Sequence, residues 1–229
     1  MKRTRSPRGV DKVSRYLIIL DMRTYRAMIF DCGGVIFHCS FDNAFKHWAA
    51  VTRRDVDEIK SKFDFDDRFQ EFERGEISSG LFRQITMDKL ELKMSDEEFD
   101  AGWNSIYIEL VPGIEQLLHV LTSMYRIVAL TNTNAIHAHM WRILCSSVLK
   151  HFEKVFSSHE IGARKPEKKA YETVLNYLGL NPQNTIFFDD NPEFVQAAAA
   201  MNITSIQVTS FKQMTDEMRK RGIRLRHAV

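Results

Sequence analysis

An apolar tetrapeptide that ends on a carboxylate and two glycines constrains this chain most. Residues 27–30 read Ala-Met-Ile-Phe, and Asp31, Cys32, Gly33 and Gly34 follow them. A short apolar run bounded by a turn signal is typical of a strand that a parallel sheet buries on both faces. The carboxylate then lies at the carboxyl end of the strand, where open α/β sheets bind their ligands. The glycines permit a sharp turn and a close approach of the backbone to that ligand.

The composition is that of an ordinary globular protein without an electrostatic bias. Of the 229 residues, 44% are hydrophobic and 27% are charged, and the formal net charge is +2. Such a chain offers no broad basic surface to nucleic acid or to a membrane, so we expect a small-molecule partner. The three cysteines have no CxxC spacing, which argues against a zinc site or disulfide framework and favours a reducing, cytoplasmic compartment.

Residues 1–24 are expected to form a poorly ordered N-terminal extension. Basic residues precede the apolar run at 16–20, an arrangement that superficially resembles a signal peptide. The run is too short for that role and ends at Asp21, so we reject a secretion signal. No glycine turn follows Asp21, and we interpret this run as an edge or auxiliary strand.

Residues 39–109 are predicted to form a helical cap inserted between two α/β segments. Aromatic residues recur there at intervals of three and four, which is the spacing of a helix face. Gly75 with Ser78 indicates a helix end and a new start, and Ser95 with Glu98 forms a capping box. We expect a lid with a hinge near each end, and one or two of its rings to face the site. The rings considered are Trp48, Phe63, Phe65, Phe69, Phe72 and Trp103.

The α/β pattern covers residues 25–38 and 110–229. Further apolar strands are predicted at residues 127–130, 155–156, 185–188 and 203–208. Helical patterns separate them, with Pro166 in the first turn of one helix and Asn191 and Pro192 at the start of another. Strand and helix alternate four times, so the predicted fold class is α/β, a doubly wound parallel sheet with an inserted all-helical cap.

Three carboxylates follow two of the predicted strands at one edge of the sheet. Asp31 ends the first strand, and Asp189 and Asp190 follow the strand at 185–188. Carboxylates from separate strands repel one another when they meet, and oxygen-only ligands of this kind suit Mg²⁺. We therefore expect a magnesium site at this edge.

Thr131 and Asn132 follow another strand at the same edge, and Lys165 lies at a helix start between them and the acidic pair. Each of these residues alone is often only a cap or a turn residue. Together, a lysine ammonium and a threonine hydroxyl offset the charge of a bound phosphoryl group. The set predicts a small phosphorylated metabolite as the ligand. The histidines at 137, 139, 151 and 159 match no zinc signature, and we expect surface or hydrogen-bonded histidines there.

Four segments in this order resemble the motifs of the haloacid dehalogenase superfamily of hydrolases. They are residues 30–35, 130–132, 165–166 and 188–190. The resemblance covers residues 27–208, and the helical insert lies where the family has a cap of the first type. Within the family the chain is most similar to sugar-phosphate phosphatases resembling bacterial α-glucose-1-phosphatase. The segments that carry this closer similarity are residues 31–35, 73–78, 131–134, 164–167 and 187–191.

The resemblance implies a phosphatase that works through an aspartyl-phosphate. Asp31 is then the nucleophile, and Lys165 neutralises both the nucleophile and the phosphate. Thr131 and Asn132 hold phosphoryl oxygens, together with the backbone N–H groups of the turn. The residues of that turn are Cys32, Gly33 and Gly34.

The resemblance also implies a ligand set for Mg²⁺. Asp190 is the expected direct ligand, and Asp189 binds through water or orients that water. Asp31 and the backbone carbonyl of Gly33 complete the set. The implied activity is Mg²⁺-dependent hydrolysis of a small phosphomonoester, a sugar phosphate by the closer similarity.

Gly33 departs from the pattern of most phosphatases in this superfamily, which have a second aspartate there as the general acid. Loss of positioned acid–base catalysis costs about 10²–10⁴ in rate. Water or a cap side chain would have to protonate the leaving oxygen instead, and His38, His47 and Glu76 are the candidates.

Two other functions stay open on this scaffold. A 2-haloacid dehalogenase uses the same nucleophile without a metal, and a catalytically decayed phosphatase would only bind its ligand. The acidic pair at 189–190 favours phosphoryl transfer over the first, since a dehalogenase has no need of a metal site.

Overall fold

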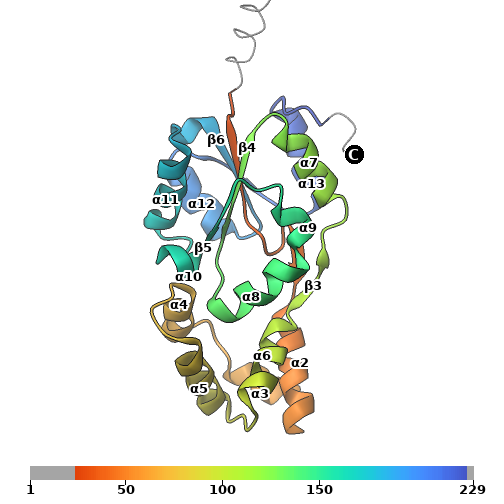
Figure 1. The fold of residues 1–229 in the computed structure, drawn as a ribbon, viewed down its shortest axis with the longest axis vertical. Coiled ribbons are helices and arrows are strands. Elements are labelled where there is room, and N and C mark those ends of the chain that lie inside the picture. Colours follow the sequence, from red (N-terminus) through yellow and green to blue (C-terminus); the bar gives the residue numbers. More distant parts are fainter. Residues whose placement is uncertain (1–23, 226–229) are drawn as a thin grey trace, which may run out of the picture.

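The computed structural model describes residues 24–225, and within them the chain forms a five-stranded parallel sheet (Figure 1). The order of the strands is β5-β4-β1-β6-β7. Their bounds are β1 (Ala27–Phe30), β4 (Arg126–Thr131), β5 (Lys154–Ser157), β6 (Thr185–Asp189) and β7 (Thr204–Gln207). The first strand is central, with Phe30 paired to Ala129 on one side and to Phe188 on the other.

Helices cover both faces of this sheet, which confirms the doubly wound α/β class. Helices α7, α9 and α13 lie on one face, and α11 and α12 on the other (Figure 1). Their bounds are α7 (Ile114–Thr122), α9 (Ser146–Leu149), α11 (Lys168–Leu178), α12 (Pro192–Ala200) and α13 (Phe211–Lys220). The connections also contain α10 (Ser158–Ile161) and the 3₁₀ turn η1 (Pro182–Asn184).

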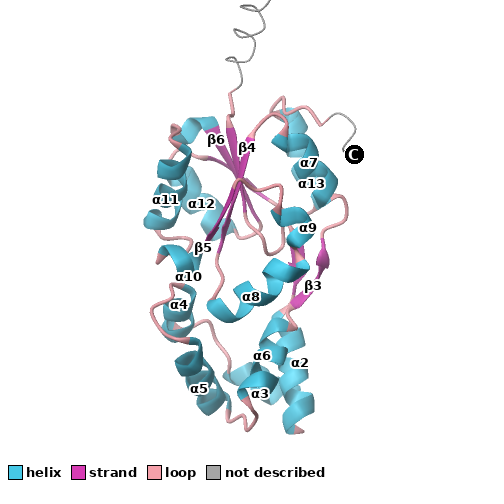
Figure 2. Cartoon of the chain, in the orientation of Figure 1, coloured by secondary structure: helices cyan, strands magenta, loops and turns pink. Residues whose placement is uncertain are grey.

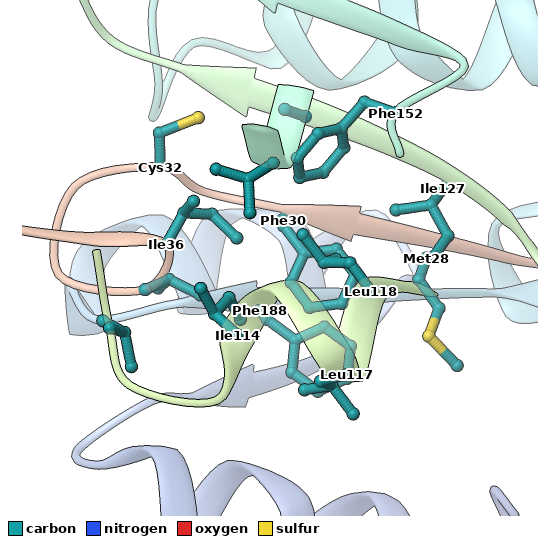
Figure 3. Close-up of a cluster of buried hydrophobic side chains, with 14 of the residues drawn as sticks. Met28, Phe30, Cys32, Ile36, Ile114, Leu117, Leu118, Ile127, Phe152 and Phe188 are labelled. Atoms are coloured by element: carbon teal, nitrogen blue, oxygen red, sulfur yellow. The ribbon is translucent and has the colours of Figure 1, made fainter. Parts of the chain in front are cut away.

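Each face of β1 contributes to a different hydrophobic core. Met28 and Phe30 pack into one cluster, whereas Ala27 and Ile29 pack into the other, as alternating side chains of a buried strand must. Figure 3 shows the first of these clusters, in which the rings of Phe30 and Phe188 stack with centroids 4.8 Å apart. Cys32 is buried in the same cluster (Figure 3), so its side chain packs in the hydrophobic core.

The residues between β2 (Phe37–Cys39) and β3 (Tyr107–Leu110) are helical and have a hydrophobic core of their own. We call helices α2 to α6 the helical unit; it lies at one end of the molecule, with the sheet at the other (Figure 2). Its helices are α2 (Phe41–Thr52), α3 (Val56–Lys62), α4 (Asp67–Glu73), α5 (Ser79–Leu90) and α6 (Asp96–Asn104). The strands β2 and β3 pair antiparallel where the unit joins the sheet. Helix α8 (Ala135–Leu144) packs against α6.

The helix boundaries mostly follow the predicted capping signals. Ser95 forms a capping box with Glu98, and the Ser78 side chain caps α5. Asn191 caps α12, whose first residue is Pro192.

The prediction for Pro166 is wrong. Helix α11 begins only at Lys168, because Glu167 has an extended backbone and acts as the N-cap, so Pro166 precedes the helix. The strand predicted at 203–208 is shorter and spans residues 204–207. The strand proposed to end at Asp21 lies outside the described residues. Between residues 24 and 225, no helix has the length and apolar character needed to cross a bilayer.

Candidate active site

Two neighbouring strands bring their terminal carboxylates to one buried lysine. Asp31 directly follows β1, and Asp189 is the last residue of β6. Lys165 Nζ donates to Asp31 Oδ1 and to Asp189 Oδ2, at 2.6 Å in each case. Burial lowers the pKa of Lys165, but the two carboxylates raise it by more, so the pKa lies above its ordinary value. The lysine is therefore a charged ammonium in the interior, held by its two partners.

Asp190 joins these groups and makes the cluster strongly acidic. Carboxylate oxygens of Asp31, Asp189 and Asp190 lie within 4.8 Å of one another. Burial raises the pKa of Asp31 to about 7, against the attraction of Lys165, and the negative charge of Asp189 adds to the rise. Burial and Asp189 likewise raise the pKa of Asp190. One lysine cannot neutralise three carboxylates, so these oxygen donors fit a hard divalent cation such as Mg²⁺.

The two glycines of the turn after Asp31, Gly33 and Gly34, differ in the space around them. Gly34 has a φ of +72°, and a Cβ there would lie 2.3 Å from Asp190 Oδ2. Only glycine lets the loop pass so close to that carboxylate. At Gly33, a Cβ would meet Cys39 Sγ at 3.5 Å and Asp31 Oδ2 at 3.9 Å, which are ordinary contacts. A Cβ therefore fits at Gly33, the position at which the resemblance implies an acid in most phosphatases of the superfamily.

Asn132 holds the loop that carries the lysine. Its Nδ2 donates to the Lys165 carbonyl at 2.9 Å, and its Oδ1 accepts from the Lys165 N–H at 2.8 Å. The second N–H of the Asn132 amide is not used in these two bonds and can donate to a ligand. The N–H of Gly34 donates to the Phe37 carbonyl at 2.8 Å, so this predicted phosphate donor already has a partner.

A cavity of about 290 Å³ opens beside these groups. Gly33, Thr131 and Asn132 line it from the sheet. The helical unit and its loops line the opposite side, chiefly with rings. The rings are Phe41, Phe65 and Phe69. Two of the six aromatic residues considered from the sequence, Phe65 and Phe69, thus face the site, as expected.

The fold and this constellation agree with the comparison to known families. A model of the haloacid dehalogenase-like hydrolase family matches residues 25–202. This chain belongs to the haloacid dehalogenase-like hydrolases.

Several relatives of the hydrolase are phosphatases. A D-ribitol-5-phosphate phosphatase of Bacteroides thetaiotaomicron is 24% identical over 79% of this chain and 90% of the relative. A sesquiterpene phosphatase of Aspergillus oryzae is 27% identical over 86% of this chain and 96% of the relative. A solved structure of a family enzyme from B. thetaiotaomicron, in complex with magnesium and inorganic phosphate, superposes with a TM-score of 0.71. It is 26% identical, and the match covers 82% of this chain and 96% of that one.

The structure of the hydrolase does not bring the three predicted acid candidates to the cavity. His38, His47 and Glu76 are not among its lining residues, and the Glu76 side chain is exposed and bonds Arg74 at 2.9 Å. Glu73 lines the cavity instead and is 6% exposed. It lies four residues after Phe69 on α4, the one sequence signal that could have indicated a shared helix face.

Glu73 forms an ion pair that joins the helical unit to the sheet edge. Its Oε2 accepts from Arg164 Nε at 2.7 Å, next to the buried lysine in the chain. Burial raises the pKa of Glu73, and Arg164 acts in the opposite direction. Arg74 pairs with Glu167 at 3.1 Å across the same boundary.

His137 is a second residue of the cavity that the sequence did not identify. It was expected to be exposed or fully hydrogen-bonded, but the ring is buried and its Nε2 has no partner among the described residues. The expectation is wrong for His137 because helix α8 turns this face toward the helical unit. His151 and His159 also each have one buried ring nitrogen without a partner among the described residues.

Proposed function

We propose that this hydrolase is a Mg²⁺-dependent phosphatase of a small phosphomonoester, with Asp31 as the nucleophile. The observation that carries the proposal is the cluster in which Lys165 bridges Asp31 and Asp189 beside Asp190. A nucleophilic carboxylate, a fixed ammonium and spare carboxylates for a cation are the groups that phosphoryl transfer to a side chain needs.

The reaction has two steps. A carboxylate oxygen of Asp31 attacks phosphorus while the bond from phosphorus to the leaving oxygen breaks, and this oxygen takes a proton from water. The products are an aspartyl-phosphate and an alcohol. A second water then attacks phosphorus, which releases inorganic phosphate and restores Asp31. Lys165 holds the carboxylate in place and balances part of the charge on both sides of the reaction.

The metal ligands are proposed from the availability of their oxygens. Both oxygens of Asp189 have partners, Lys165 Nζ and the Asn191 N–H, whereas Asp190 is exposed at the edge of the cluster. Asp190 is therefore the better direct ligand, completed by Asp31 and the Gly33 carbonyl. Mg²⁺, when bound, neutralises phosphoryl oxygens and aligns them with the nucleophile.

The phosphate site is proposed from groups that converge on the same edge. The Thr131 hydroxyl, the remaining N–H of Asn132 and the backbone N–H groups of Cys32 and Gly33 supply donors. Gly34 is left out of the donors because its N–H bonds Phe37.

We further propose that residues 39–109 act as a cap on a core of residues 25–38 and 110–229. The cavity between sheet edge and helical unit supports this division, since its two walls come from the two parts. A sugar or polyol phosphate is the proposed substrate class, because one relative is a D-ribitol-5-phosphate phosphatase. The cytoplasm is the proposed compartment, from the cysteine usage of the sequence.

A panel of phosphorylated metabolites with Mg²⁺ tests this function. We expect inorganic phosphate release from at least one sugar or polyol phosphate, its loss with EDTA, and no release by Asp31→Asn. Halide release from 2-haloacids that resists EDTA would favour the dehalogenase instead. Activity retained by Asp31→Asn would contradict the mechanism.

A further inference from the structure

A residue that lines the cavity has a buried acceptor atom without a partner among residues 24–225. His137 lies on α8, is 4% exposed and lines the cavity. Its Nε2 is buried and has no hydrogen-bond partner in the part of the chain that the structure describes. Buried polar atoms without partners are rare because each one destabilises the fold. An atom of this kind, on a residue that lines the cavity, indicates a contact that a ligand completes.

The partner of the other ring nitrogen fixes the chemistry of Nε2. His137 Nδ1 lies 3.2 Å from Asn104 Oδ1, and an amide oxygen only accepts, so Nδ1 carries the hydrogen. Burial lowers the pKa of His137 to about 3, so the ring is neutral at physiological pH. Nε2 therefore presents a lone pair, which binds a donor such as a hydroxyl group.

The surrounding rings prevent the imidazole from finding a partner by rotation. Trp103 stacks on it with centroids 4.8 Å apart and an angle of 8° between the planes. Tyr107 packs edge-on at 5.5 Å. The backbone N–H of His137 is held by Asn134 Oδ1 at 3.1 Å. The acceptor is thus fixed in position before any ligand binds.

The rest of the cavity wall explains why a hydroxyl on a carbon chain suits this acceptor. The carboxylate of Glu73 differs from this acceptor because it is part of an ion pair, in which Oε2 accepts from Arg164 Nε. The helical unit contributes rings such as Phe69, which pack against C–H groups. A group that presents both C–H surface and a hydroxyl donor satisfies both parts of the wall.

We propose that His137 Nε2 accepts a hydrogen bond from a hydroxyl on the leaving group, which makes His137 a specificity residue for polyol and sugar phosphates. This inference rests on the proposed phosphatase function. A phosphomonoester without that hydroxyl leaves Nε2 buried and unpaired, and the enzyme discriminates against it.

The test compares substrates with and without the hydroxyl in two variants. His137→Phe keeps a ring against Trp103 but removes the acceptor, and His137→Gln places an amide oxygen near the position of Nε2. We expect His137→Phe to lower kcat/KM for the best sugar or polyol phosphate by about 10- to 100-fold, mainly through KM. Turnover of p-nitrophenyl phosphate, which has no aliphatic hydroxyl, should stay within about threefold. His137→Gln should recover part of the loss.

A matched control and a substrate series complete the design. His139→Phe changes an exposed histidine of the same helix and should leave kcat/KM unchanged. Among monodeoxy analogues of the best substrate, one should lose about 10- to 100-fold with the wild-type enzyme and be indifferent to His137→Phe. This arm uses the wild-type protein, so the test survives if a variant fails to fold.

The outcomes separate this inference from the proposed function. Equal losses on p-nitrophenyl phosphate and on the sugar phosphate, or no loss on either, would overturn the role of His137, since Nε2 would then pair with a water only. If the wild-type enzyme releases phosphate from no phosphomonoester, including p-nitrophenyl phosphate, the phosphatase function itself is wrong and the inference falls with it.

Discussion

The sheet edge and the helical unit, which form the two walls of the cavity, contribute different kinds of side chain. The sheet edge contributes polar groups such as Thr131 and Asn132. The charged cluster lies at the same edge, with Lys165 at 2.6 Å from both Asp31 and Asp189.

The helical unit contributes chiefly rings, which fill volume without directed bonds, together with the carboxylate of Glu73. Its rings at the cavity are Phe41, Phe65 and Phe69. Hydrogen bonds and ion pairs depend on exact positions, which the ends of buried strands provide. Apolar contacts tolerate substitution more readily. In the proposed function, the sheet edge carries out the reaction, and the helical unit together with His137 of α8 contacts the leaving group.

The two walls meet at the end of α4. Glu73 pairs with Arg164 there, and Gly75 lies so close to the core that a Cβ would come within 2.4 Å of the His159 carbonyl. At the end of α4 the boundary thus consists of ion pairs and a backbone contact. Elsewhere the boundary is apolar, since the hydrophobic cluster of the helical unit includes Ile136 of α8.

The largest effect is expected at the sheet edge. Asp31→Asn removes the nucleophile but keeps its shape, so phosphate release should fall by about 10³-fold or more on every substrate. Steady-state rates on a sugar phosphate and on p-nitrophenyl phosphate measure this, with circular dichroism as the control for folding. A loss of rate on only one of the two substrates would contradict the assignment of the reaction to the sheet edge.

The next effect separates the two glycines. Gly34→Ala places a methyl group against Asp190 at a positive φ, so activity should fall by about 10- to 100-fold. More Mg²⁺ should be needed for half-maximal rate. Gly33→Ala is the matched control, because a Cβ there meets only ordinary contacts, and its activity should stay within about threefold. Equal losses in the two variants would contradict the geometry of this turn.

A smaller effect is expected where the walls meet. Glu73→Gln keeps the shape of the side chain but removes the charge that pairs with Arg164. KM for sugar phosphates should rise by about 3- to 10-fold with little change in kcat. Glu76→Gln, at an exposed carboxylate, is the control and should change neither constant. If kcat falls instead and depends more steeply on the pKa of the leaving group, Glu73 supplies the missing proton, and the helical unit takes part in the reaction.

The smallest effect concerns stability against pH. Burial raises the pKa of Asp31 to about 7, so the folded protein binds more protons than the unfolded chain between about pH 4 and pH 7. Without Mg²⁺, the stabilisation from this proton is present below pH 4 and lost as the pH rises through 7. Melting temperatures should fall across this range, since one pKa unit corresponds to about 1.4 kcal/mol and about 1 kcal/mol to 2–4 °C. The melting temperature of Asp31→Asn should not show this dependence on pH. If the melting temperature of the wild-type protein is equally independent of pH, the pKa of Asp31 is not raised by burial.

The sequence by itself determined the sheet and the cluster of charged residues at its edge. Asp31, Thr131 and Asp189 each end an apolar strand, and the carboxyl ends of parallel strands meet at one edge whatever surrounds them. Capping residues such as Ser95 set helix boundaries because their partners lie within three residues. Pro166 differs from these residues. Its preference for the first turn of a helix is not followed, because the segment at 165–167 places Lys165 beside the carboxylates before α11 begins at Lys168.

Only the tertiary structure decided which residues outside the sheet edge line the cavity. Helical spacing tells which residues share a face, but the face of α8 that carries His137 meets the cavity because α8 packs against α6. Glu73 is a partner of Arg164 because α4 ends beside the core, a contact between residues 91 positions apart. Gly33 and Gly34 looked equivalent as turn residues until their distances to neighbouring side chains separated them. Local bonds are encoded in neighbouring residues, whereas a cavity depends on how separate elements pack, and no short segment contains that information.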